Sequence, residues 1–166
     1  MSKQSSIANV LAKTKANWPE SNNQISPEIL RIHRVSAYCQ QNLSLVLEPY
    51  GLQVAEFSVL ETLRKEKPPY CLTPTELSSA MLFSSGGLTK VLNRMHTAGL
   101  IQRMDNPNDK RGKLVQLSES GQSLIGEVIV KLHNTEQQKF NVLNTEEKAQ
   151  LNHLLNRILQ VWEEDA

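Results

Sequence analysis

The sequence has few cysteines, few aromatic residues and no long hydrophobic run. Its 166 residues include two cysteines, and aromatic residues make up 5%. Two cysteines are too few for a disulfide scaffold, which favours a reducing cytoplasm. No uncharged apolar stretch approaches the roughly 18 residues of a membrane span, and the first residues lack the apolar core of a signal peptide. These shortages argue against secreted and membrane-spanning classes and predict a cytoplasmic protein.

A strong net charge is also lacking. The formal net charge is +1, which by itself does not favour a nucleic-acid partner. The charges are unevenly distributed, however: residues 81–116 hold six basic and two acidic side chains, whereas residues 117–166 hold four basic and eight acidic ones. A central positive block can bind phosphates while its flanks stay neutral or acidic. Ordinary surface variation produces such blocks too, so charge alone does not decide the function.

Motifs for catalysis and metal binding are missing as well. The sequence contains no nucleophile elbow, phosphate-binding loop or zinc motif. Its histidines are scattered without the spacing of metal ligands; they are His33, His96, His133 and His153. The sequence therefore predicts neither an enzyme nor a metal or cofactor site.

What the sequence does contain is a set of clear helix signals, beginning with long amphipathic segments near both ends. Ser26-Pro27 predicts a helix start, with the serine hydroxyl as cap and proline at the first helical position. A last helix is expected to open at Asn144, with Glu147 three residues later. Mostly apolar positions then form a stripe with helical spacing: Ile29, Ile32, Ser36, Cys39, Leu43 and Val46 in the first helix, and Leu151, Leu154, Leu155, Ile158, Leu159 and Trp162 in the last. Each stripe needs a partner surface, and a second copy of the chain is the simplest one, which predicts a two-fold homodimer.

The middle of the chain predicts two short helices and a hairpin. The segment from Thr73 to Glu76 has the pattern of a capping box, and Ser84 or Ser85 can cap a second helix that ends at Gly99. Two short helices joined by a tight polar turn form a helix-turn-helix. Residues 100–104 and 113–117 then alternate like strands around the polar tip 105–112. The expected fold is mainly α with a small β-hairpin wing, a winged helix-turn-helix with N- and C-terminal dimerisation helices.

This order of elements predicts three regions. Residues 1–20 are expected to form a flexible N-terminal arm. Residues 53–117 are expected to form the winged helix-turn-helix domain, and residues 21–52 together with 118–166 the helical dimerisation region. No internal repeat or low-complexity segment interrupts this organisation.

At four places the residues resemble the MarR family of bacterial transcription regulators. The segment 51–60 resembles the family's approach to its helix-turn-helix, and the segments 72–77 and 99–103 resemble its two borders. The family's wing signature is Asp-x-Arg, three residues, Val-x-Leu-Thr, two residues and Gly. It is matched by Asp109, Arg111, Val115, Leu117, Ser118 and Gly121, with serine replacing threonine. The resemblance spans residues 27–141 and implies a homodimeric, DNA-binding regulator, usually a repressor, on a pseudo-palindromic operator.

The resemblance and the residue chemistry point to the same recognition helix. We expect it to contact duplex DNA through Ser84, Ser85, Gly86, Gly87, Thr89, Lys90, Asn93 and Arg94. Its N-terminus suits a phosphate, Lys90 and Arg94 suit guanine or phosphate, and Asn93 can pair bidentately with adenine. The two serines have an alternative role as simple helix caps.

On the wing, the expected DNA contacts are Asp109, Lys110, Arg111 and Lys113. A guanidinium on a hairpin tip suits insertion into a narrow minor groove, so Arg111 is the main candidate. Asp109 is expected to orient Arg111, whereas Lys110 and Lys113 add affinity without sequence preference. The alternative is a solvated hairpin whose charges only keep it soluble.

Family members usually respond to a signal, and the resemblance is greatest to the PecS-like, urate-responsive branch. This implies a small aromatic or purine-like effector contacted by Trp18 and Ser58. The branch tends to carry an aspartate where this chain has Ser58, which disfavours urate itself, and Trp18 can instead pack the N-terminal arm. Two further alternatives are redox sensing through Cys39, although a thiol on an apolar stripe is usually inert, and a winged-helix adaptor that binds protein rather than DNA.

Overall fold

The computed structural model describes residues 5–81, 87–107 and 109–164, and it describes only the backbone of residues 109–111. The chain folds into two compact units, Met1–Val54 and Ala55–Ala166. The first unit is helical. Its elements are α1 (Ile7–Asn17), α2 (Pro19–Asn22), α3 (Pro27–Leu47) and the 3₁₀ helix η1 (Glu48–Tyr50).

Within the segment 1–20, expected to be a flexible arm, the described residues form helix α1 and the start of α2; the flexibility of this arm stays a prediction. Ser6 caps α1 by accepting a hydrogen bond from the backbone N–H of Asn9 at 3.1 Å. Trp18 ends α1, and a proline at the first position of α2 starts the next turn at once. Arg34 of α3 also donates to the carbonyl of Ser5 at 3.0 Å. Neither contact was predicted from the sequence.

Helix α3 begins where the sequence predicts, with Pro27 in the first turn. The prediction that the Ser26 hydroxyl caps this helix is wrong, because Ser26 occupies the N-cap position without a side-chain hydrogen bond. The apolar stripe is buried only towards its C-terminal end, where Leu43, Val46 and Leu47 lie in the core. Towards the N-terminal end of the helix the stripe is exposed within a single chain: the exposed fraction is 46% for Ile29 and 40% for Ile32.

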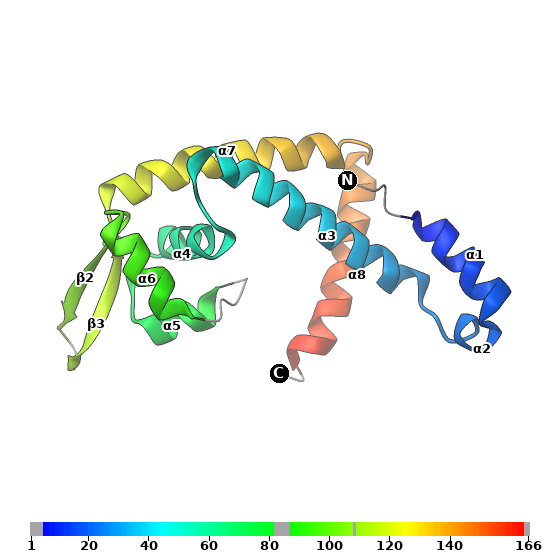
Figure 1. Cartoon of the computed structure of the whole chain (residues 1–166), viewed down its shortest axis with the longest axis horizontal. Coiled ribbons are helices and arrows are strands. Elements are labelled where there is room, and N and C mark those ends of the chain that lie inside the picture. Colours follow the sequence, from blue (N-terminus) through cyan, green and yellow to red (C-terminus); the bar gives the residue numbers. More distant parts are fainter. Residues whose placement is uncertain (1–4, 82–86, 108, 165–166) are drawn as a thin grey trace. The chain divides into compact units, whose positions relative to one another are not determined.

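The second unit combines helices with a small antiparallel sheet (Figure 1). Its elements are α4 (Val54–Lys65), β1 (Cys71–Leu72), α5 (Pro74–Ala80), α6 (Leu88–Thr97), β2 (Ile101–Asn106), β3 (Asp109–Leu117), α7 (Glu119–Phe140) and α8 (Thr145–Glu164). The core of this unit is formed by buried side chains from most of them: Phe57, Leu60, Leu63, Leu77, Met95, Ile101, Val115, Ile125 and Val128. This core fixes α6 against the hairpin that follows it in the chain.

The sheet has three strands in the order β1-β3-β2. The predicted hairpin is confirmed, but its strands are longer than expected: pairing continues to Asp105 with Lys113 and, after a register shift, to Asn106 with Asp109. Most of the described residues in the predicted polar tip 105–112 therefore belong to strands. Charged side chains of opposite sign that face each other across a solvent-exposed pair of strands are compatible with this pairing. The two-residue strand β1 is too short to show an alternating pattern and was not predicted.

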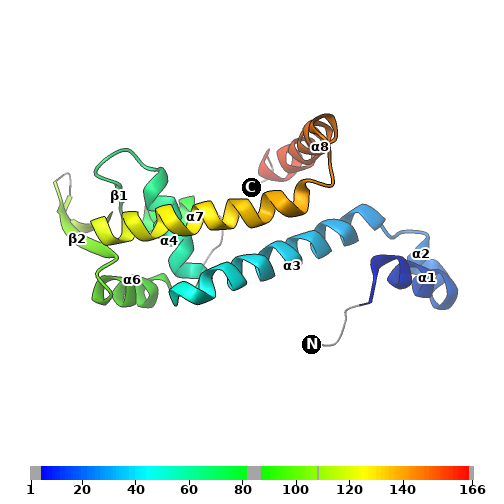
Figure 2. The same ribbon diagram turned by 90° about the horizontal axis from the view of Figure 1, so that it is seen from above.

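The two long C-terminal helices have locally determined starts. Ser118 caps α7 by accepting from the N–H of Gly121 at 3.0 Å. Before α8, Asn144 and Glu147 bond each other's backbone N–H groups at 2.8 and 2.9 Å, which confirms the predicted helix start. Helix α8 turns away from the end of α7 (Figure 2), and no described residue of α8 is buried. Among the described residues, none of the helices combines the length and apolar character that crossing a bilayer requires.

Candidate nucleic-acid interface

Helix α5 forms the first half of the helix-turn-helix, and its start is fixed by a capping box. The hydroxyl of Thr73 accepts from the N–H of Glu76 at 3.2 Å, and the Glu76 carboxylate accepts from the N–H of Thr73 at 2.8 Å. The pKa of Glu76 is lowered most by the hydrogen bond from the Thr73 backbone and next by the one from the Thr73 side chain. The predicted capping box is confirmed.

Helix α6, the second half, starts on a glycine. Gly87 is the N-cap, with a φ of 87° and no side-chain cap hydrogen bond. This left-handed backbone conformation is readily adopted by glycine and costs other residues free energy. The prediction that Ser84 or Ser85 caps this helix is therefore wrong. Ser84, Ser85 and Gly86 lie outside the described residues, so their expected phosphate contacts stay predictions.

Helix α6 has one buried apolar face and one exposed polar face, and the polar face holds the expected DNA contacts. Val91, Leu92 and Met95 are buried. On the opposite side, four polar side chains are exposed: Thr89, Lys90, Asn93 and Arg94. This face therefore offers hydroxyl, ammonium, amide and guanidinium groups to a partner.

Arg94 is held by a carboxylate that the sequence analysis did not single out. Its Nε donates to Oε1 of Glu56 on α4 at 2.6 Å. The Glu56 side chain is 8% exposed and that of Arg94 is 48% exposed. A nearly buried carboxylate needs such a partner. Arg94 thus anchors α6 to α4, whereas the sequence analysis expected it to serve guanine or phosphate.

Asn93, the neighbouring residue, is held from the other side. Nη2 of Arg103 on β2 donates to Oδ1 of Asn93 at 2.5 Å. Both side chains are exposed. The sequence analysis counted Arg103 only as a positive charge, because nothing in a single sequence shows that β2 lies beside α6. The recognition helix is thereby tied to the hairpin as well as to α4.

The described part of the wing carries one ion pair. Nζ of Lys113 bonds Oδ1 of Asp105 across the β2–β3 ladder. The hydrogen bond from Lys113, followed by its charge, lowers the pKa of Asp105. Lys113, expected to be a phosphate contact, is therefore partly neutralised. Asp109, Lys110 and Arg111 lie on β3, but their side chains are outside the described residues, so the expected orientation of Arg111 by Asp109 is untested.

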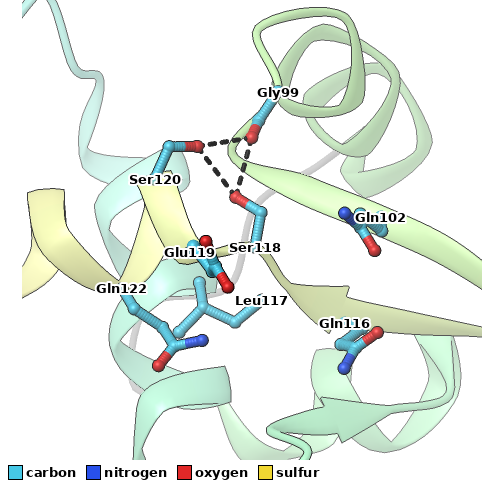
Figure 3. Close-up of a pocket in the computed structure, with 8 residues that line it drawn as sticks. All are labelled: Gly99, Gln102, Gln116, Leu117, Ser118, Glu119, Ser120 and Gln122. Atoms are coloured by element: carbon cyan, nitrogen blue, oxygen red, sulfur yellow. Dashed lines mark hydrogen bonds between the residues drawn. The ribbon is translucent and has the colours of Figure 1, made fainter.

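A pocket of about 470 Å³ lies where the hairpin meets the start of α7 (Figure 3). It is lined by Gly99, Gln102, Gln116, Leu117, Ser118, Glu119, Ser120 and Gln122. The hydroxyls of Ser118 and Ser120 both donate to the carbonyl of Gly99 at 2.7 Å. These bonds join the end of the helix-turn-helix to α7. The protons of both hydroxyls are thus engaged within the chain.

The residues expected to contact an effector lie in different units of the chain. Trp18 is 62% exposed at the junction of α1 and α2. Ser58 on α4 is 1% exposed, and its Oγ is buried without a hydrogen-bond partner. Cys39 and Cys71 are both partly buried. Among the described residues, no group of three histidine, cysteine or acidic side chains is arranged to hold a metal ion.

Comparison with known proteins gives the same fold and function class. The family model described as MarR family matches residues 50–112. The multiple antibiotic resistance protein MarR of Escherichia coli is 34% identical over 141 residues, which cover 82% of this chain and 94% of that protein. The transcriptional regulator PecS of Dickeya dadantii is 28% identical over 152 residues, or 92% of each chain.

A solved structure extends the similarity to three dimensions. The crystal structure of a mutant MarR from Escherichia coli complexed with operator DNA matches with a TM-score of 0.68 and 34% identity. The match covers 82% of this chain and 96% of that one. Helix-turn-helix, hairpin wing and flanking helices are thus shared over most of both chains. This chain belongs to the MarR family of winged-helix, DNA-binding transcription regulators.

Proposed function

We propose that this protein is a homodimeric repressor that binds a pseudo-palindromic DNA operator and whose DNA affinity is modulated by a small aromatic ligand. The observation that carries the proposal is the exposed polar face of α6, next to a wing that bears the family signature. Lys90 on this face is exposed and suits phosphate or guanine, and Gly87, the N-cap, supplies no side-chain cap to a helix N-terminus that suits a phosphate. Helix α6 would lie in the major groove and the wing over the adjoining minor groove.

The proposed DNA contacts fall into two groups. On and before α6 they are Ser84, Ser85, Gly86, Gly87, Thr89, Lys90 and Asn93; on the wing they are Asp109, Lys110, Arg111 and Lys113. We assign Arg94 mainly to holding α6 in place, because its Nε donates a hydrogen bond to Glu56. Arg111 keeps its proposed place in the minor groove on the basis of the wing signature.

The dimer is supported by apolar side chains that a single chain leaves uncovered. On α8 these are Leu154, Ile158, Leu159, Val161 and Trp162, all between 44% and 66% exposed. A contiguous apolar surface on a helix favours burial against a partner, and a symmetric dimer covers it with an identical copy. We therefore assign residues 118–166, with 21–52, to the dimerisation region and residues 53–117 to the DNA-binding domain.

The effector remains defined only by class. Ser58 supports a site near α4, because a buried hydroxyl without a partner is costly and a ligand group can satisfy it. Trp18 offers an exposed indole for stacking. A thermal-shift screen of aromatic acids and purines tests this part. A ligand that raises the melting temperature of the native protein but not of a Ser58→Val variant would support it, and an equal rise in both would contradict the assignment of Ser58.

The DNA-binding part is tested by titration with duplex DNA at several salt concentrations. Neutralised phosphates release counterions, so the logarithm of affinity should fall linearly with the logarithm of salt, by about 0.9 per phosphate contact. A protein-binding adaptor predicts no such slope and no sequence preference. Absence of measurable binding to a pool of random duplexes at low salt would contradict the proposed function.

A further inference from the structure

The contact between Arg103 and Asn93 has a specific consequence for how the protein reads DNA. On β2, Arg103 follows two residues after Ile101 and pairs with Val115. Both of those side chains are buried, at 1% and 2% exposed. Since side chains two apart on a strand share a face, Arg103 emerges on the core side of the sheet, beside α6. From there its guanidinium reaches Oδ1 of Asn93 at 2.5 Å.

This bond determines which way the asparagine amide faces. The asparagine side chain has an accepting oxygen and an NH₂ group that only donates, whereas arginine has five donors and no acceptor. Arg103 can therefore bond only the oxygen, which directs Nδ2 away from the wing. Bidentate pairing with adenine needs Oδ1 to accept from the adenine amino group while Nδ2 donates to N7. The bond to Arg103 takes one of the two lone pairs of that oxygen and fixes its direction, so Nδ2 is the group of the amide that is turned towards a base.

We propose that Arg103 is a positioning residue that sets base specificity: it orients Asn93 so that Nδ2 donates to an acceptor edge in the major groove. Such edges are N7 and O6 of guanine, N7 of adenine and O4 of thymine. The inference rests on the proposed function, because it assumes that α6 lies in that groove. It is compatible with the adenine contact expected from the sequence, because Oδ1 keeps a second lone pair, and it adds Arg103 as the residue that orients the amide.

One feature of the structure and one general effect of DNA binding favour a lasting arrangement. The next residue, Arg94, is anchored to Glu56 on α4, so the same turn of α6 is held from two directions. In free protein an exposed bond of this kind contributes little to stability. When DNA excludes water, the local dielectric falls and the bond strengthens. The competing outcome is capture of Arg103 by a phosphate, which would release Asn93.

The test is selection of bound duplexes from a random DNA pool, with the full-length protein and its variants. Asn93→Ala and Arg103→Ala should lose the preference at the same base-pair position in each half-site. Each should lower the affinity for the selected sequence by about five- to tenfold relative to random DNA. The double variant should lose no more than either single one. Lys113→Ala is the charge control: it should lower affinity for all sequences and leave that preference unchanged.

A second pair of variants tests the direction of the amide. Asn93→Asp keeps an oxygen for Arg103 but removes the NH₂ donors, so the preference should shift from acceptor edges to the amino groups of cytosine or adenine. Arg103→Lys keeps a charged donor and should restore part of the preference lost in Arg103→Ala. Replacing the preferred purine by its 7-deaza analogue should weaken binding of the native protein and not of Asn93→Ala.

Three results would overturn the inference. The first is an Arg103→Ala variant that weakens binding to every sequence equally with a shallower salt dependence, since that describes a phosphate contact. The second is an unchanged base preference in Arg103→Ala. The third is additive losses in the double variant. A native protein that enriches no sequence at all would instead overturn the proposed function, and this inference with it.

Discussion

Glu56 and Arg94, 38 residues apart in the chain, form an ion pair between α4 and the recognition helix, with 2.6 Å between Oε1 and Nε. The carboxylate is almost buried and the guanidinium is half exposed. Arg94 lies next to Asn93, which is bonded to β2. One turn of α6 is therefore connected both to the helix behind it and to the wing beside it. This arrangement couples the orientation of the DNA-reading face to the rest of the domain.

We expect Arg94→Ala to lower the free energy of unfolding by roughly 1–3 kcal/mol, because it removes a charge-assisted partner from a nearly buried carboxylate. Urea denaturation measures this change. Lys90→Ala is the matched control, since it removes the same charge from an exposed position one turn earlier and should change stability by less than about 0.5 kcal/mol. Equal, small effects of both substitutions would show that the ion pair does not anchor the helix.

Gly121 of the wing signature is expected to be required by close packing. A Cβ at this position would lie 2.2 Å from the carbonyl oxygen of Leu100 and 2.9 Å from Cδ1 of Leu117. Because a backbone atom cannot yield without moving the start of α7, Gly121→Ala should destabilise the protein by about 1–3 kcal/mol or more. Thermal or urea unfolding measures the loss.

Gly126, in the same helix, provides the control. A Cβ there meets nothing within 4 Å. Gly126→Ala should therefore raise stability, by up to about 1 kcal/mol, because alanine is the better helix former. Similar melting temperatures for the two variants would contradict the packing argument.

The sequence predicted those parts of the fold whose partners are close in the chain. The capping box of Thr73 and Glu76 and the start of α8 join residues three apart, and both are confirmed. Ser118 shows the limit of such reasoning. Its role as the cap of α7 is local, but its hydroxyl also donates to the carbonyl of Gly99, 19 residues away. Only the fold brings those two groups together.

For the candidate site, the sequence predicted which residues of α6 face a partner, but not which residues of other elements contact them within the chain. Helical periodicity correctly separated the buried side of α6 from Lys90 and its exposed neighbours. Periodicity says nothing about which residue of another element meets that face, so the partners of Asn93 and Arg94 were missed. Glu56 offered the one available signal, a carboxylate within the apolar helix 54–65, where an ion partner is to be expected.

The wing signature leads to a prediction for Arg111. We expect Arg111→Ala to weaken binding to a selected operator substantially, by about tenfold or more, and to leave folding unchanged, because a guanidinium in the minor groove is lost. A gel-shift titration measures the affinity and circular dichroism the fold. Lys13→Ala, which removes an exposed charge from the first unit, is the control and should have little effect. Unchanged affinity in Arg111→Ala would exclude the wing from the DNA contact.

The exposed apolar face of α8 predicts how the chain associates. Ile158 and Leu159 are 44% and 46% exposed in a single chain. Replacing both by aspartate would place two charges in a buried interface, so the protein should become monomeric. Light scattering after size-exclusion chromatography measures the mass. The control, Asn156→Asp, adds one charge at an exposed polar position of the same helix and should remain a dimer.

Loss of the dimer should also reduce DNA binding. A dimer binds two linked half-sites more tightly than one, because the second contact is intramolecular once the first has formed. The monomeric Ile158→Asp, Leu159→Asp variant should therefore lose at least about a hundredfold in affinity for a palindromic duplex and far less for a single half-site. A variant that is monomeric yet binds the palindrome as the native protein does would show that α8 is not needed for operator recognition. A variant that stays dimeric would place the interface elsewhere in the chain.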